Sequence, residues 1–103
     1  MDKITRLKEF LQANPEDNFV QHALALEYVK IGEVEKAQQL FESLLMRDET
    51  YVGSYYHLGK LLEKRGMTAE AIDWYEKGML HAKQAGDQHA LNELRAAYED
   101  LID

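Results

Sequence analysis

The chain contains no cysteine and only one proline. Without thiols it can form neither disulfides nor thiolate metal sites, and this composition fits a reducing compartment. The scarcity of proline, together with many Leu, Ala, Glu, Gln and Lys residues, favours helix almost throughout the chain. We therefore expect an all-α protein.

Long apolar runs are also missing, because no stretch approaches roughly 18 consecutive apolar residues. The first residues alternate in charge and lack the apolar core of a signal peptide. The net charge of −7 argues against a surface for duplex nucleic acid, since phosphate contacts need clustered Lys and Arg. We expect a soluble, cytoplasmic protein that binds neither membranes nor nucleic acid.

A chain of 103 residues is long enough to bury most of its apolar side chains but too short for two independent cores. We therefore expect a single domain.

What the sequence does contain is an internal repeat. The stretch 55–80 has a counterpart that lies 34 residues earlier, which is the separation of Leu24 from Leu58. The matching pairs are Leu24 and Leu58, Ala25 and Gly59, Gly32 and Gly66, Ala37 and Ala71, and Phe41 and Tyr75. A fixed period of this length is typical of a helical repeat solenoid.

Apolar spacing and stop signals predict about six helices. The ranges are 2–13, 16–31, a third helix from about 33, a fourth after 48, a fifth over 68–84, and a last one from 87 to about 101. Asn14 and, one period later, Asp48 suit the N-cap positions of the second and fourth helices, with Pro15 as a first helical residue. Thr68 is the expected cap of the fifth helix, and Asp87 that of the last.

These residues resemble the tetratricopeptide repeat family, whose unit of about 34 residues pairs two helices. The matching residues are Leu24, Ala25, Tyr28, Gly32, Ala37 and Phe41, and then Leu58, Gly59, Leu62, Gly66, Ala71 and Tyr75. The small residues allow two helix backbones to approach, and the aromatic residue fills the space between them. The sequence departs from the family at Gln21, where Trp is preferred, at Glu49, where Pro is preferred, and at Leu44 and Gly78, where Ala is usual.

The resemblance implies a right-handed superhelix of stacked antiparallel helix pairs. A half-repeat helix over 1–15 would precede two repeats over 18–51 and 52–85, and a capping helix over 87–103 would close the open end.

In this family the first helix of each repeat lines a concave groove that holds an extended peptide or a partner helix. By position, the residues that the resemblance assigns to the groove are Phe19, His22, Ala23 and Leu26, followed by Tyr56, His57, Lys60 and Lys64. In the last helix, either Asp87 and Leu91 or His89 and Glu93 would face it. The Lys, Asn and Arg residues with which some members grip a C-terminal carboxylate are absent, so binding of chaperone tails is not implied. The resemblance thus predicts an adaptor that binds a protein or peptide.

Two alternatives remain open. The apolar face of Phe19, Ala23 and Leu26 would also suit self-association into a homodimer. His22 and His57 could share a metal ion, but a site needs at least a third ligand, so we expect no metal.

Catalytic motifs are missing as well. No nucleophile elbow, glycine-rich phosphate loop or HExxH motif occurs in the sequence. We expect no enzymatic activity and no cofactor.

Overall fold

The computed structural model describes residues 2–103, so Met1, within the predicted half-repeat, lies outside the described part. Residues 2–103 form six α-helices and no strand, which confirms the prediction of an all-α protein. The helices are α1 (Lys3–Ala13), α2 (Asn18–Lys30), α3 (Val34–Arg47), α4 (Gly53–Lys64), α5 (Thr68–Ala85) and α6 (Gln88–Ile102).

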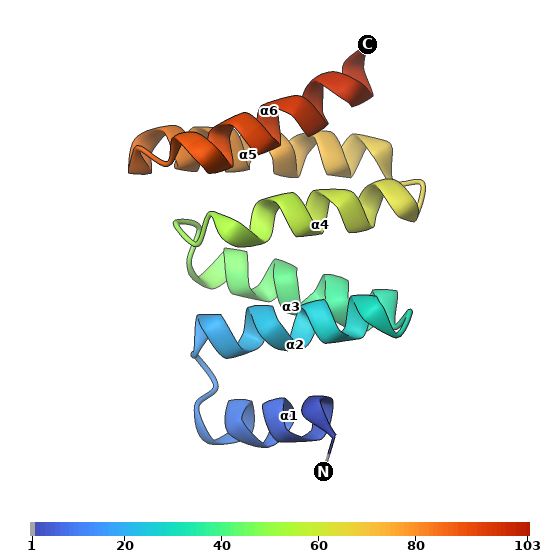
Figure 1. The fold of residues 1–103 in the computed structure, drawn as a ribbon, viewed down its shortest axis with the longest axis vertical. Helices are drawn as coiled ribbons and strands as arrows, with labels where there is room; N and C mark the ends of the chain where they lie inside the picture. Colours follow the sequence, from blue (N-terminus) through green and yellow to red (C-terminus); the bar gives the residue numbers. More distant parts are fainter. Residues whose placement is uncertain (1) are drawn as a thin grey trace. The chain divides into compact units, whose positions relative to one another are not determined.

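The helices group into two compact units, the first ending at Arg47 and the second beginning at Asp48. In the first unit, α2 packs between α1 and α3 (Figure 1). In the second unit, α5 packs against both α4 and α6, and α4 also contacts α6. Each unit therefore contains one complete helical hairpin, α2–α3 or α4–α5, with one additional helix.

The three turns that follow α2, α4 and α5 have the same geometry. Gly32, Gly66 and Gly86 adopt positive φ angles of 81°, 75° and 69°. In each turn the N–H of the residue after the glycine donates to the carbonyl five positions earlier, at 2.9 Å. This is the Schellman arrangement, which satisfies carbonyls at the end of a helix and favours glycine because its φ is positive. The repeat seen in the sequence is thus a repeat of backbone hydrogen bonds.

The start of α2 differs from the prediction. Asp17, rather than Asn14, caps this helix, because its carboxylate accepts a hydrogen bond of 3.0 Å from the N–H of Val20. The side-chain amide of Asn14 instead donates back to the carbonyl of Phe10, at the end of α1. Pro15 consequently lies in the connection before the helix and is not its first residue.

Two other predicted caps are also wrong. The carboxylate of Asp48 accepts hydrogen bonds from the N–H and the hydroxyl of Thr50, and so it closes a local turn ahead of α4. Thr68 is the first residue of α5 and makes no capping hydrogen bond. The predicted cap of α6 is confirmed, because the Asp87 carboxylate accepts from the N–H of Ala90 at 3.0 Å.

In the α4–α5 hairpin, small residues of one helix lie against large aromatic side chains of the other. Gly59 of α4 lies against Tyr75 of α5, so closely that a Cβ placed on this glycine would be 2.1 Å from the ring. Gly78 of α5 lies against Tyr55 of α4, where an added Cβ would be 2.6 Å from the Tyr55 Cβ. The departure from Ala at position 78 is therefore explained by the buried Tyr55 side chain, which occupies the space that a methyl group would need.

Gln21, which stands where the family prefers Trp, is almost fully buried. Its amide nitrogen donates to the carbonyl of Leu40 at 2.8 Å and to the hydroxyl of Ser43 at 2.7 Å. Its amide oxygen accepts from Arg47 at 3.1 Å. A hydrogen-bonded bridge between α2 and α3 thus takes the place of an apolar ring, and no polar atom of Gln21 is left unsatisfied.

Candidate functional site

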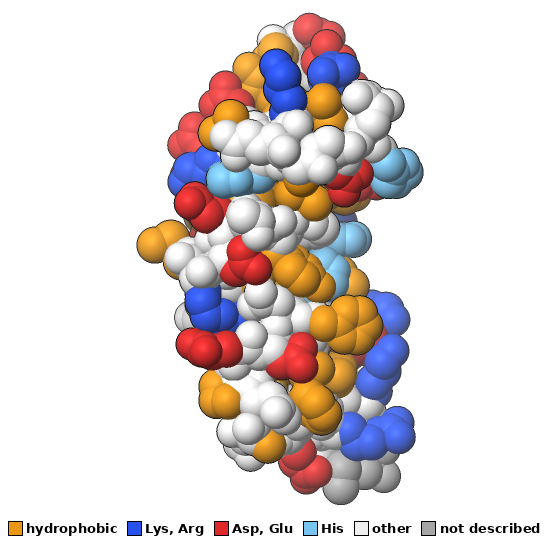
Figure 2. All heavy atoms as spheres, turned by 90° about the vertical axis from the view of Figure 1, so that its left-hand side faces the viewer, with side chains coloured by type: hydrophobic (Ala, Val, Ile, Leu, Met, Phe, Trp, Pro, Cys, Tyr) orange, Lys and Arg blue, Asp and Glu red, His pale blue; other side chains and the backbone are white. Residues whose placement is uncertain are grey.

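The predicted residues of α2 form a partly exposed apolar face in the first unit. Phe19 is 73% exposed, whereas His22 and Leu26 are half-buried. Residues three or four positions apart lie on one side of a helix, so these three side chains share a face. The His22 ring meets the buried Phe41 ring edge-on, with centroids 5.6 Å apart. The centre of this face, at His22, thus packs against the core, whereas Phe19 is exposed to solvent. In the lower half of Figure 2, over this unit, several apolar side chains reach the surface.

The predicted residues of α4 are more polar and cationic. Tyr56 and Lys60 are half-buried, whereas His57 and Lys64 are exposed. The ammonium of Lys60 lies 5.8 Å from the centroid of the Tyr56 ring and 3.6 Å from the carboxylate of Glu63. The Tyr56 and His57 rings meet edge to face at 5.7 Å. This face offers aromatic surface and cations side by side.

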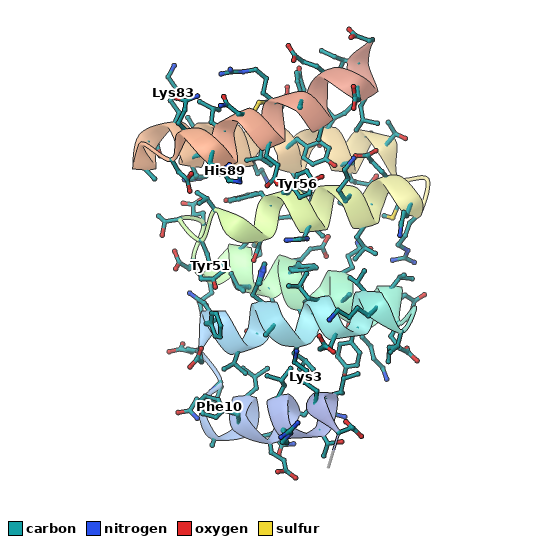
Figure 3. All side chains as sticks on the ribbon, viewed as in Figure 1. Lys3, Phe10, Tyr51, Tyr56, Lys83 and His89 are labelled. Carbon is teal, nitrogen blue, oxygen red and sulfur yellow. The ribbon has the colours of Figure 1, made fainter. Side chains whose placement is uncertain are left out.

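In the second unit, α6 contributes to the same surface. Figure 3 places His89 and Tyr56 in the space between α6 and α4. Glu93, one turn further along α6, acts electrostatically on His57. The Asp87 carboxylate caps the N-terminus of α6 by accepting a hydrogen bond from the N–H of Ala90. His89 and Glu93, one of the two pairs that the sequence left open for the last helix, thus lie on the side of α6 near α4.

Partial desolvation holds the pKa of His57 below its ordinary value of 6.5, because it disfavours the imidazolium, and Glu93 acts in the opposite direction. Folding thus favours the neutral ring. The folded state therefore has its full stability, as far as His57 is concerned, above the unfolded pKa. It loses stability as the pH falls through the lowered folded pKa, because the unfolded chain binds the proton more readily.

We expect Glu93→Gln to lower the pKa of His57 further, because it removes the carboxylate that favours the imidazolium. An NMR titration of the His57 ring measures this, with Glu70→Gln on α5 as a control that should leave the pKa unchanged. A His57 pKa at or above 6.5 in the unaltered chain would contradict the assignment.

The first unit also contains a groove of about 570 Å³ between α1 and α3, with α2 as its floor. It is lined by Lys8, Leu11 and Gln12 of α1, by Pro15, by Leu24 and Tyr28 of α2, and by Lys36, Gln39, Leu40 and Ser43 of α3. Sequence reasoning did not find it, because its walls come from helices that are distant in the chain and whose separation no local pattern encodes.

Within residues 2–103, no group of three or more His, Asp or Glu side chains is arranged to hold a metal ion. None of the helices in this part of the chain is both long and apolar enough to cross a bilayer.

Comparison with known proteins places these features in a family context. The sequence model described as tetratricopeptide repeat matches residues 52–80, which include α4 and most of α5. The crystal structure of a tetratricopeptide repeat domain protein from Salinibacter ruber is 44% identical to this chain, with a TM-score of 0.80, and the match covers 82% of this chain and 94% of that one. The solution structure of a tetratricopeptide repeat domain protein from the same organism gives 45% identity, a TM-score of 0.81 and coverage of 84% and 88%.

A solution structure of a Bordetella parapertussis protein is similar over 99% of this chain and 89% of its own length, with 25% identity and a TM-score of 0.83. No curated protein matches the chain. The structural matches confirm the prediction of an α-helical repeat fold.

Proposed function

Because the chain belongs to the tetratricopeptide repeat family, we propose that it is an adaptor that binds a peptide or helix of a partner protein through the first helix of each repeat. The repeats are 18–51 and 52–85, between a half-repeat helix over 1–15 and a capping helix over 87–103. The partner-binding residues are Phe19, His22 and Leu26 of α2, and Tyr56, His57, Lys60 and Lys64 of α4.

The observation that carries the proposal is the exposure of Phe19. A phenylalanine that is 73% exposed contributes little to the folded state, and keeping a large ring in water is unfavourable. Leu26 continues the same apolar face two turns along α2. An aromatic anchor beside an aliphatic residue is the kind of contact that dominates binding energy at protein interfaces.

The α4 face adds a different chemistry. Lys60 places a cation beside Tyr56, and Lys64 adds a second one turn further along α4, in a chain whose net charge is −7. These cations favour carboxylates or backbone carbonyls of a partner, and they disfavour a basic one. Because one helix from each repeat offers only a short surface, we expect modest affinity.

Capture of partners from a lysate of the source organism tests the α2 face. Leu26→Glu should reduce the captured partner at least about tenfold, because it places a charge where an apolar side chain must be buried. Leu80→Glu on α5 is the matched control, since Leu80 is also a large exposed apolar residue, at 54%. Equal capture by the two variants would reject the α2 assignment.

For α4, Lys60→Glu is compared with Lys83→Glu, which makes the same charge change on α5. If Lys60→Glu leaves capture unchanged, the α4 face does not bind the partner.

Exposure of Phe19 also supports a second candidate, in which the face of Phe19, Ala23 and Leu26 is covered by another copy of the chain. Sedimentation distinguishes the two, because a strict monomer at high micromolar concentration excludes the homodimer and leaves the adaptor.

A further inference from the structure

The groove between α1 and α3 lies on the side of α2 away from the proposed partner-binding face. Each residue turns an α-helix by about 100°, so Leu24 and Tyr28 project roughly opposite to Phe19 and Leu26. A ligand in the groove would therefore leave the proposed binding face uncovered.

The floor of the groove is apolar and consists of core side chains. Leu24 and Tyr28 are almost fully buried there, and Leu11 and Leu40 form half-buried walls on either side. The volume of about 570 Å³ lies within the range of about 300–1,000 Å³ that is usual for ligand sites. The groove is large enough for an apolar side chain and the backbone that carries it.

The rim of the groove is cationic. Lys8 and Lys36 line it, and no Asp or Glu does. Within residues 2–103, no ion pair joins Lys8 to a carboxylate. The Lys36 ammonium lies 5.6 Å from the centroid of the buried Tyr28 ring and 3.9 Å from the carboxylate of Glu33, and the side chains of Lys36 and Glu33 are 59% and 50% exposed. Although the chain as a whole is acidic, the two lysines at this rim would attract the carboxylates of a ligand.

The complementary surface is the end of α6, which we define by Glu99, Ile102 and Asp103. Glu99 and Ile102 are three positions apart and so share one side of α6, and Asp103 directly follows Ile102 at the end of the helix. Ile102 is 52% exposed, and both carboxylates are exposed. In Figure 1, α6 crosses α5 at an angle, and its C-terminal end stands away from α5. An apolar side chain flanked by two acids is thus presented to solvent.

We propose that the groove of one copy binds the α6 end of a second copy. Ile102 would enter the apolar floor, and Glu99 and Asp103 would lie against Lys8 and Lys36. Because the two surfaces differ, such contacts join copies head to tail, into closed rings or growing chains. A single helix end covers much less than the roughly 1,200–2,000 Å² of a stable interface, so association should be weak and visible at hundreds of micromolar.

Charge reversal tests this contact. Sedimentation at about 0.15 M salt, from about 10 µM to about 1 mM, should show mass that increases with concentration for the unaltered chain. Reversing the groove (Lys8→Glu with Lys36→Glu) or the α6 end (Glu99→Lys with Asp103→Lys) should weaken association at least about tenfold, because attraction becomes repulsion. Combining all four substitutions in one chain should restore it, since the pairs are again opposite in charge.

The control is Lys77→Glu with Lys83→Glu, which makes the same change in net charge on α5 and should leave assembly as in the unaltered chain once far-UV circular dichroism confirms its fold. A chain that stays monomeric throughout would overturn the proposal. It would also be overturned if the groove variant assembles normally or if the fourfold variant, folded by the same criterion, does not reassemble. Assembly that is lost with Leu26→Glu and kept in both charge variants would identify the α2 face as the contact. Partner capture by Leu26→Glu is measured in a separate experiment. The proposed adaptor function and the head-to-tail contact can therefore fail independently of each other.

Discussion

Gly59→Ala should destabilise the chain by about 2 kcal/mol, although alanine is the better helix former. In an open helix interior this substitution gains about 1 kcal/mol. Here the new methyl group would lie 2.1 Å from the ring of Tyr75, which is fully buried. The Tyr75 hydroxyl also donates a hydrogen bond to the Glu63 carboxylate, so the ring has little freedom to move. Overpacking of this kind costs about 1–3 kcal/mol and sometimes more, which outweighs the gain in propensity.

Urea unfolding measures this effect, and Gly53→Ala is the matched control. Gly53 begins the same helix, and a methyl group there would meet nothing within 4 Å. We expect Gly53→Ala to be neutral or slightly stabilising. If both variants unfolded at the same urea concentration, the close approach of α4 and α5 would be wrong.

Phe41→Ala should cost about 3–5 kcal/mol, the range for removal of a buried aromatic side chain. Phe41 of α3 is fully buried, and its ring is in edge contact with His22 of α2. Truncation leaves a cavity between the two helices of the first hairpin. The same change at Phe19, which is 73% exposed, should alter stability by less than about 1 kcal/mol.

The pair Phe41→Ala and Phe19→Ala also separates stability from binding. Phe19→Ala should keep the unfolding midpoint and reduce partner capture, because its ring has no role in the core. Thermal unfolding together with capture measures both. Loss of stability on truncation of Phe19 would place that ring in the core and remove it from the binding face.

The helices and the repeat could be predicted because their signals are local. The 34-residue period and the glycines at 32, 66 and 86 specify turns whose hydrogen bonds run within a few residues. The caps were harder, because Asn14 and Asp17 both suit an N-cap by type. Asn14 bonds backward to α1, and this leaves the N–H groups of α2 to Asp17. The start of α2 thus depends on which of two neighbouring side chains reaches the free N–H groups of the helix. Residue type alone does not predict this.

The candidate surfaces were predictable to the level of a helix face. The family resemblance assigned Phe19 and Leu26 to one face and Tyr56 and Lys60 to another, and the spacing of each pair is compatible with one side of a helix. The partners of His57 on α6 could not be fixed in this way. With α5 at 18 residues and α3 at 14, the last helix is shifted against the strict period. The position of Glu93 therefore depends on tertiary packing.

We propose that the exposed face of α2 and that of α4 each contact a partner polypeptide. The most direct measurement is an NMR map of amide and side-chain shifts of this chain as it is titrated with the captured partner fragment. We expect the largest changes at Phe19, His22 and Leu26 and at Tyr56 and Lys60, with little change along the buried sides of α3 and α5. Shift changes confined to α3 and α5, with the signals of the α2 and α4 faces unchanged at saturation, would show that the partner binds elsewhere.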